Sequence, residues 1–294
     1  MKDAEKIFGP KHRVTLKASR DLGAVLRGQQ RYEEAEVMHR KTLALSKEVL
    51  GLEDIQTLWD TCFLAQVLSC QERHQEAVEL QREELVLRKK VNGPESPDTL
   101  ASMKSLGYLL NKQGQYKEAE AVHRETLVLR KKVLGPEHPH TLQSMGFLGL
   151  ALSRLGRHKE AETIHNEALE LSINVLGRDH RDTLGHMHNV GILLGTQDRV
   201  EEAEVVHKET WALRNKALGP EHPDTLTSMK WLGFTIGKQG KYIESEALLR
   251  NTLALRQKAL GYKYSDTLET IDLLRWVLIG QGRFEEAMSI TNRG

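Results

Sequence analysis

The chain has 294 residues, and its 42 Lys and Arg nearly cancel its 41 Asp and Glu, so the formal net charge is only +1. A near-neutral chain has no overall field that would attract nucleic acid or an anionic lipid surface, and any electrostatic preference must be local. Aromatic residues make up only 5% and prolines number 7, which is typical of a helical protein whose core consists of Leu, Val, Ala and Met.

The first residues and the two cysteines predict a cytoplasmic location. Residues 1 to 6 contain no apolar segment of a secretory signal, and the longest uncharged run, residues 138 to 153, is too short to span a membrane. Cys62 and Cys70 lie about 12 Å apart along one predicted helix, which is too far for a disulfide. They are expected to be buried or groove-facing thiols in a reducing compartment.

One short sequence motif recurs along the whole chain at a constant interval. It reads Leu-Gly-Pro-Glu-His-Pro-His-Thr-Leu at residues 134 to 142, and its glycine recurs every 42 residues, at positions 9, 51, 93, 135, 177, 219 and 261. No insertion or deletion shifts this register over seven frames. Such a period indicates a stacked array of repeats rather than one closed globule.

Each repeat is predicted to contain two helices. Residues 1 to 8 match the end of a second helix, and apolar residues from Val14 to Leu26 then recur at helical spacing, which predicts a first helix of about fifteen residues. Gln29 to Arg31 interrupt it, and the same break carries glycine in later repeats, at positions 114, 156, 240 and 282. A left-handed residue there ends the helix without strain. A second helix is predicted to follow, with Tyr32, Ala35, Leu43 and Leu45 as its apolar positions and with its end at Val49-Leu50-Gly51.

The ends of these helices carry typical capping residues. Arg130-Lys131-Lys132 place positive charge at the negative end of a second helix. Pro139, Pro223 and Asp98-Thr99 suit the first turn or the cap of the next first helix. Acidic pairs such as Glu33-Glu34 begin second helices, where the helix dipole favours them, so they do not require a paired-carboxylate catalytic role.

The small and large residues of each repeat resemble those of the tetratricopeptide repeat. Leu106 and Gly107 lie in the first helix, Tyr116 follows the turn, and Ala119 and Leu127 lie in the second helix. Repeats of that family are commonly about 34 residues long. The 42-residue form, with its Leu-Gly-Pro-Glu-His-Pro-Asp-Thr-Leu linker, resembles the repeats of kinesin light chain. It resembles even more the arrays at the carboxyl end of fungal NOD-like receptor proteins.

The resemblance implies an all-α solenoid, a right-handed superhelix of antiparallel helical hairpins. We predict a single tetratricopeptide-repeat array over residues 1–294, with six complete repeats from about residue 10 and a truncated seventh over residues 262–294. Residues 1–9 would be the end of a preceding helix. Uncapped terminal repeats expose apolar faces, so we expect both ends to be cuts in a longer array and self-association to occur through them.

The seven copies of each position separate scaffold from variation. Positions that hold a small residue in every repeat, such as Ala35 and Ala119, are predicted to let the two helices approach closely. Variable first-helix positions are expected to line the concave inner face, by analogy with the family. In kinesin light chain two of these columns are commonly asparagine, which only Asn189 keeps. The candidate partner-binding residues are Arg20, Phe63, Lys104, Tyr108, Lys112, Phe147, Arg154, His188, Asn189, Lys230, Trp231, Phe234 and Lys238.

Lysine and arginine in this set offer positive charge, and the aromatic residues offer stacking surface. An extended acidic peptide or protein segment with an aromatic or apolar anchor would suit such a groove. A second interpretation stays open, in which the variable polar residues are solvated and the aromatic residues only cap the core between neighbouring hairpins.

No metal, cofactor or catalytic set is expected. Most of the thirteen histidines recur once per repeat, and successive hairpins lie roughly 10 Å apart, too far to share one ion. We predict that they are solvated or hydrogen-bonded structural residues; their two columns are His39, His123, His165 and His207, and His12, His138, His180 and His222. The segment from Gly233 to Lys238 is one residue short of a phosphate loop and lies inside a predicted helix.

The sequence thus predicts a non-enzymatic protein-protein interaction scaffold that binds a peptide segment or partner protein in its concave groove. Binding of nucleic acid is not expected, because a continuous basic face and repeated base-reading pairs are lacking, and neither is membrane binding. The alternative, which the resemblance implies, is a sensor or regulatory repeat region of a larger NOD-like nucleotide-binding signalling protein. The sequence leaves both open.

Overall fold

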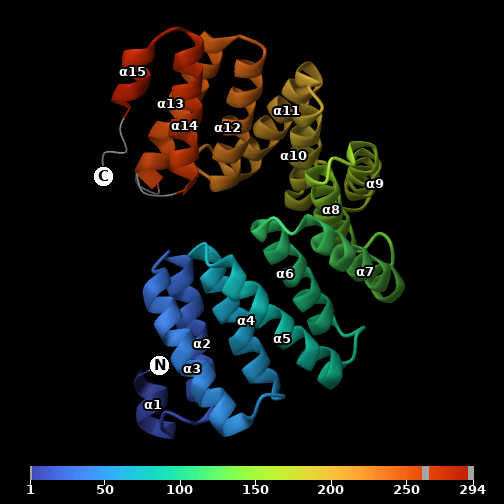
Figure 1. Cartoon of the computed structure of the whole chain (residues 1–294), viewed down its shortest axis with the longest axis vertical. Helices are drawn as coiled ribbons and strands as arrows, with labels where there is room; N and C mark the ends of the chain where they lie inside the picture. The colour runs from blue at the N-terminus through green and yellow to red at the C-terminus, as the bar shows by residue number, and fades with distance from the viewer. Residues whose placement is uncertain (1, 260–264, 291–294) are drawn as a thin grey trace. The chain divides into compact units, whose positions relative to one another are not determined.

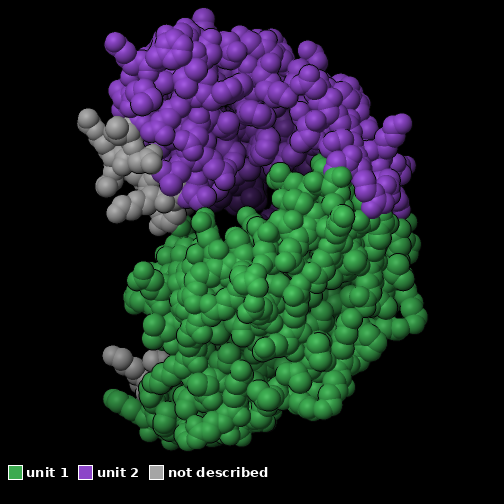
Figure 2. Space-filling model, viewed as in Figure 1, with its two compact units in different colours: residues 1–155 green, residues 156–294 purple. Residues whose placement is uncertain are grey.

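The structure of the chain, a computed structural model, describes residues 2–259 and 265–290. Over these ranges it is built of fifteen α-helices and contains no strand (Figure 1). The prediction of an all-α fold of helical hairpins is therefore confirmed. The helices group into two compact units, unit 1 with residues 1–155 and unit 2 with residues 156–294 (Figure 2). The single uninterrupted array stays a prediction, and Gly261 and residues 291–294 lie outside the described ranges.

Unit 1 begins with a short helix and then alternates first and second helices of the repeats. Each helix packs against its sequence neighbour, as in α2 with α3 and α3 with α4. The helices of unit 1 are α1 (Lys2–Phe8), α2 (Arg13–Gly28), α3 (Tyr32–Leu50), α4 (Ile55–Cys70), α5 (His74–Asn92), α6 (Pro97–Gln113), α7 (Tyr116–Leu134) and α8 (Pro139–Arg154).

Unit 2 continues the alternation with a second helix. Neighbours again pack pairwise, and the first helices α10, α12 and α14 also contact one another along the chain. The helices of unit 2 are α9 (His158–Leu176), α10 (Arg181–Thr196), α11 (Val200–Leu218), α12 (Pro223–Lys238), α13 (Tyr242–Ala259), α14 (Ser265–Gly280) and α15 (Phe284–Ser289).

In three linkers the recurring glycine and threonine are hydrogen-bonded to each other. Gly93 has φ of +81° with ψ of 161°, a conformation that is essentially restricted to glycine. Its carbonyl accepts a hydrogen bond from Thr99 Oγ1 at 2.7 Å. The same bond joins Thr141 to Gly135 at 2.8 Å. The constant spacing places the threonine hydroxyl within reach of this carbonyl in these linkers, whereas Thr183 donates to the Ser172 carbonyl instead.

The tight turn between the two helices of a hairpin requires a left-handed residue, as predicted. Gly114 adopts φ of +82°, and the glycines at positions 156, 240 and 282 have φ between +75° and +78°. Where the repeat lacks glycine, Gln30, Glu72 and Asp198 take the same conformation, with φ of +61° to +63°. Because an L side chain is disfavoured there, these three turns are strained.

The linker histidines cap the first helices. Nδ1 of His138 accepts the backbone N–H of His140 at 3.1 Å, and His222 does the same for Asp224 at 3.1 Å. His12 and His180 repeat the contact with the residue two positions on. This column is thus hydrogen-bonded and structural, as predicted. Pro139 and Pro223 occupy the first helical turn, where a missing N–H costs nothing.

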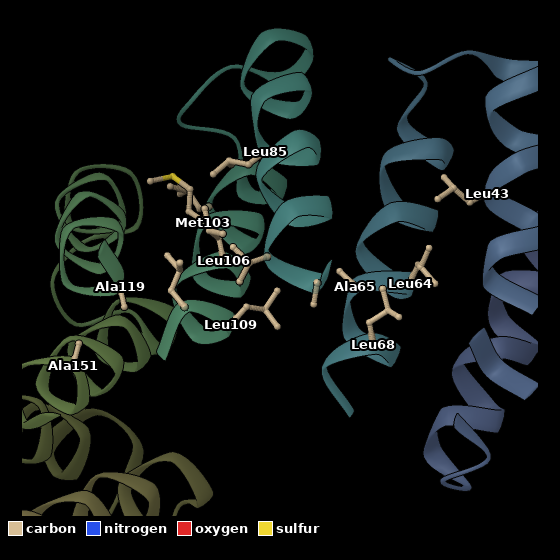
Figure 3. Packing of buried hydrophobic residues seen from close by; sticks show 14 residues of the cluster. Leu43, Leu64, Ala65, Leu68, Leu85, Met103, Leu106, Leu109, Ala119 and Ala151 are labelled. Carbon is tan, nitrogen blue, oxygen red and sulfur yellow. The ribbon is translucent and has the colours of Figure 1, made fainter. Parts of the chain in front are cut away.

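The predicted column of small residues lies at the helix contacts of the core. Ala35, Ala77, Ala119 and Ala161 are fully buried. In unit 1, Ala77 and Ala119 belong to a buried core cluster that includes Leu64 of α4 and Leu106 of α6 (Figure 3). Burying one leucine side chain contributes about 2 kcal/mol, so this core cluster stabilises the packing of the helices in unit 1.

Candidate functional site

The predicted partner-binding residues fall into two groups, one in each compact unit. The residues of each group lie on the first helices of the repeats, which are stabilised by the helix caps and the core contacts described under Overall fold. Unit 1 holds Arg20, Phe63, Lys104, Tyr108, Lys112, Phe147 and Arg154, and unit 2 holds His188, Asn189, Lys230, Trp231, Phe234 and Lys238.

In unit 1 the structure assembles part of the predicted surface on α6 and α8. Lys104, Tyr108 and Lys112 follow one another at intervals of four residues, so they share one face of α6. Lys112 Nζ lies 5.9 Å from the centre of the Tyr108 ring. That ring is 41% exposed and meets the edge of Phe147 from α8, with 6.3 Å between ring centres. We call these four residues the basic stripe.

The lysines of the basic stripe have no acidic partner among the described residues. Lys104 is half-buried, and burial, together with the nearby Arg130 guanidinium, lowers the pKa of Lys104. Lys112 is exposed, and so is Arg154 at the end of α8. An ammonium that is partly desolvated and unpaired gains from an incoming anion, so the stripe can bind a carboxylate beside an aromatic surface.

A buried histidine supports the aromatic ring of this surface from below. The imidazole of His123 stacks on Phe147 with 5.6 Å between ring centres and 11° between the planes. Its other side presses against Gly107, where an added Cβ would lie 2.3 Å from His123 Cε1. Burial lowers the pKa of His123 to about 4, so the ring is neutral at physiological pH.

The same arrangement recurs in two other repeats. His39 lies against Gly23 and stacks on Phe63 at 5.7 Å. Its counterpart in unit 2 is His207, which lies against Gly191 and stacks on Trp231 at 6.1 Å. The sequence prediction treated these histidines only as structural, and missed that they set the position of the candidate aromatic residues. The sequence holds one sign of this contact. In the repeat that has Ala65 in place of the glycine, Gln81 replaces the histidine, so the two positions change together.

Arg20 does not present its charge at a groove. Its side chain is buried, and Nη1 donates to Asp60 Oδ1 at 3.2 Å and to the Gln56 carbonyl at 3.3 Å. Ser46 also donates to Asp60, at 2.6 Å. Arg20 is therefore placed in the interior of unit 1, where it stabilises the contact between α2 and α4.

Comparison with the repeat that contains Arg130 explains why Arg20 is buried, because a buried arginine occupies the equivalent internal site there. Ser46 occupies the position of Arg130, a guanidinium that is buried rather than at the helix end where the sequence placed it. Arg130 donates to the His140 carbonyl at 2.6 Å and to Ser144 Oγ at 2.9 Å. Asp60 occupies the position of Ser144. The early repeat thus fills the same internal site with Arg20 from the first helix.

In unit 2 the predicted residues of α12 line a pocket. The pocket has a volume of about 340 Å³. Lys230 is only 7% exposed, and its Nζ donates to Glu269 Oε2 at 2.5 Å while lying 5.5 Å from the centre of the Trp231 ring. The positive charge that the sequence predicted Lys230 to offer is therefore paired with a carboxylate of the same chain. The lining residues are Lys230, Trp231 and Phe234 of α12 and Glu269, Asp272 and Leu273 of α14.

The other three predicted residues of unit 2, Lys238, His188 and Asn189, are not among the residues that line the pocket. Lys238 is exposed and donates to Asp198 Oδ1 at 3.0 Å. His188 is half-buried and meets Trp231 edge-on at 6.2 Å. Burial, followed by the Arg214 charge, lowers the pKa of His188 to about 3. Asn189 is half-buried beside it on α10.

Three residues at or beside the pocket, Trp276, Tyr242 and Glu269, were not among the candidates predicted from the sequence. Trp276 of α14 continues the aromatic surface, since its ring lies 5.6 Å from Phe234. Tyr242 then lies 6.3 Å from Trp276. Glu269 was also missed, because its column holds Lys, Trp, Ala, Gln, Gly and Thr in the other repeats and shows no chemical theme.

Neither cysteine has a thiol pKa below its ordinary value. Cys62 is buried, and burial raises its pKa to about 12. Partial burial of the thiol also raises the pKa of Cys70. The phosphate-loop-like segment lies wholly within α12, and Gly237 packs against Trp276. Within the described ranges no three His, Cys, Asp or Glu residues are grouped to hold an ion. No described helix is long and apolar enough to cross a membrane.

Comparison with solved structures yields the same repeat architecture. A protein from Podosopora anserina, described as a kinesin light chain with nearly identical TPR-like repeats, is 27% identical, with a TM-score of 0.55 over 69% of this chain and 96% of that chain. BtubC from P. vanneervenii is 19% identical, with a TM-score of 0.59 over 76% of this chain and 88% of that one. The quorum sensor NprR from B. thuringiensis, 19% identical, has a TM-score of 0.54 over 93% and 73%. The last two show similarity of fold.

No curated protein matches the sequence. The sequence profile of the tetratricopeptide repeat matches it five times, over residues 13–90, 53–131, 98–174, 148–216 and 224–293. These segments cover well over half of the chain and follow the hairpins described above. The chain therefore belongs to the tetratricopeptide repeat family.

Proposed function

We propose that this chain is a non-enzymatic scaffold that binds an acidic peptide segment of a partner protein on the basic stripe of unit 1. Tetratricopeptide repeat proteins are generally protein-interaction scaffolds, and the fold is typically non-catalytic. The observation that carries the proposal is the pair of unpartnered lysines, Lys104 and Lys112, on the helix face that also holds Tyr108.

The chemistry of the stripe defines the ligand. Two ammonium groups on one helix face suit carboxylates spaced along an extended chain, and the rings of Tyr108 and Phe147 suit an aromatic or apolar anchor between them. Lys104 adds selectivity for an anion, because its half-buried ammonium is poorly solvated. A neutral peptide of the same shape would leave that charge without a partner.

The proposal is tested by titrating the full chain with a fluorescent peptide of Glu and Asp around one Trp. We expect saturable binding that weakens as salt is added, and about tenfold weaker binding in the Lys104→Met, Lys112→Glu variant. The matched control is Lys117→Glu, an exposed lysine on α7 outside the stripe. Equal binding of a Gln and Asn version of the peptide, or an unchanged affinity in the double variant, would exclude the stripe as the site.

The sensor role in a larger NOD-like signalling protein stays a prediction that rests on the linker resemblance. It supposes a nucleotide-binding switch encoded with the array. A phosphate loop after a strand, encoded upstream in the same gene, would support it, and motor-associated heptads in that position would count against it. Cytoplasmic location and self-association through the terminal repeats likewise stay predictions.

A further inference from the structure

The pocket of unit 2 has a chemistry opposite to that of the basic stripe. Trp231 and Phe234 form an aromatic wall on α12, and their rings meet edge to face at 5.7 Å. Glu269 and Asp272 come from α14, three residues apart, so both lie on the side of that helix that lines the pocket. Their side chains are 55% and 72% exposed. The pocket therefore combines a stacking surface with accessible carboxylates.

The charges around the pocket leave acceptor capacity unused. Lys230 bonds to one oxygen of Glu269, and Arg275 donates to one oxygen of Asp272 at 3.1 Å. The second oxygen of each carboxylate has no hydrogen-bond partner among the described residues. Lys230 is buried and paired with Glu269, and Arg275 is paired with Asp272, so an incoming anion would meet two acids whose cations are already engaged. The exposed carboxylate oxygens of the pocket thus suit a basic ligand better than an acidic one.

We propose that this pocket binds an arginine side chain of a partner protein. A guanidinium is planar, stacks on aromatic faces, and can donate to two carboxylate oxygens at once. Here it would lie against Trp231 and Phe234 and donate to Glu269 and Asp272, and a pocket of about 340 Å³ has room for it. The inference rests on the proposed scaffold function but uses a different unit, helix pair and ligand charge.

The test follows the indole rings of the full chain by ¹⁹F NMR after 5-fluorotryptophan labelling. The chain has 4 tryptophans, of which Trp231 lines the pocket and Trp276 contacts its Phe234 wall. The probe is acetyl-Gly-Arg-Arg-Gly-amide. We expect saturable shifts of the Trp231 and Trp276 resonances and none of Trp59 or Trp211, each resonance being assigned by Trp→Phe substitution.

Two variants change the binding in opposite directions. Glu269→Gln with Asp272→Asn, both at exposed positions, should weaken binding by about fivefold, while the matched Glu201→Gln on α11 should leave it unchanged. Lys230→Met keeps the buried stem but releases Glu269, so it should strengthen binding by about twofold to threefold. If the groove instead used Lys230 to bind acidic ligands, Lys230→Met would weaken the binding of its ligand rather than strengthen it.

The outcomes separate this inference from the function proposed for unit 1. Equal shifts with acetyl-Gly-norleucine-norleucine-Gly-amide would reduce the pocket to an apolar slot and overturn the arginine assignment. So would tighter binding of the Glu-Glu peptide at Trp231, or the absence of any shift. Each of these results leaves the titration of the basic stripe with its own peptide and variants unaffected, because none of those residues lines the pocket.

Discussion

At the scale of single residues, the most consequential contact is the one between a buried imidazole, a glycine and an aromatic ring. Gly107 is needed because His123 occupies the space of its missing side chain. The imidazole in turn fixes the plane of Phe147, one ring of the basic stripe. The candidate binding surface is therefore positioned by buried residues behind it.

Gly107→Ala should destabilise the chain by about 1–3 kcal/mol, because the new methyl group overlaps the imidazole. The Gly107→Ala, His123→Gln double variant should recover most of this loss, since Ala65 and Gln81 already occupy these positions in another repeat. Urea denaturation followed by circular dichroism measures both. Gly185→Ala on α10, where a Cβ meets nothing within 4 Å, is the control and should gain up to about 1 kcal/mol. Additive effects of the two changes would contradict the contact.

The same imidazoles predict how stability depends on pH. Burial lowers the pKa of His123 and His207 to about 4, whereas an unfolded imidazole titrates near ~6.5. Between these values the unfolded state binds more protons, so their contribution is present above about pH 6.5 and is lost as the pH falls toward about 4. The loss should be on the order of 1 kcal/mol per histidine at about pH 5.5.

The measurement compares urea midpoints at neutral and acid pH for the natural chain and for His207→Leu. That variant copies the Gly233 and Leu249 pair of a neighbouring repeat, so it keeps an apolar residue against the glycine and removes one titrating group. As the pH falls, the variant should become more stable relative to the natural chain, because it lacks the loss that His207 causes, while carboxylate titration cancels. Parallel pH curves would show that His207 does not titrate as described.

At the scale of elements, each hairpin depends on a left-handed residue in its tight turn. Glu72 takes this conformation with a full side chain, φ +63°, where glycine has no steric penalty. Glu72→Gly should therefore stabilise the chain by about 0.5–1 kcal/mol, as a shift of the thermal midpoint. The matched Glu83→Gly, at an exposed position inside α5, should destabilise by about 1 kcal/mol. Destabilisation by both would refute the strain assigned to this turn.

At the scale of the whole molecule, the two compact units present different charges from the same columns of the repeat. Lys104 of unit 1 and Lys230 of unit 2 occupy one column, yet Lys104 has no acidic partner and Lys230 is bonded to Glu269. Because the partner belongs to the following first helix, the character of each surface depends on pairs of adjacent repeats. A repeat protein can thus offer different ligand chemistries on one scaffold.

The sequence alone determined the repeat, the helices and their ends. These follow from local rules, because the Gly93 to Thr99 bond, the left-handed Gly114 and the first-turn Pro139 act within a few residues. The small-residue column, such as Ala119, was also predictable, since it recurs in register and only one residue size fits between two helices. The aromatic candidates Phe147, Trp231 and Phe234 lie at partly exposed positions of first helices.

Only the tertiary structure decided which charged residues are available. Arg20 and Lys230 are neutralised by Asp60 and Glu269, acids 40 and 39 residues away in the chain. Which side chain of the next repeat contacts a given lysine depends on how the helices pack. Aligning equivalent positions of the repeats does not show this packing. The sequence thus predicted a surface of variable residues on a fixed scaffold, and the contacts between repeats made one part of it basic and the other a pocket with exposed acids.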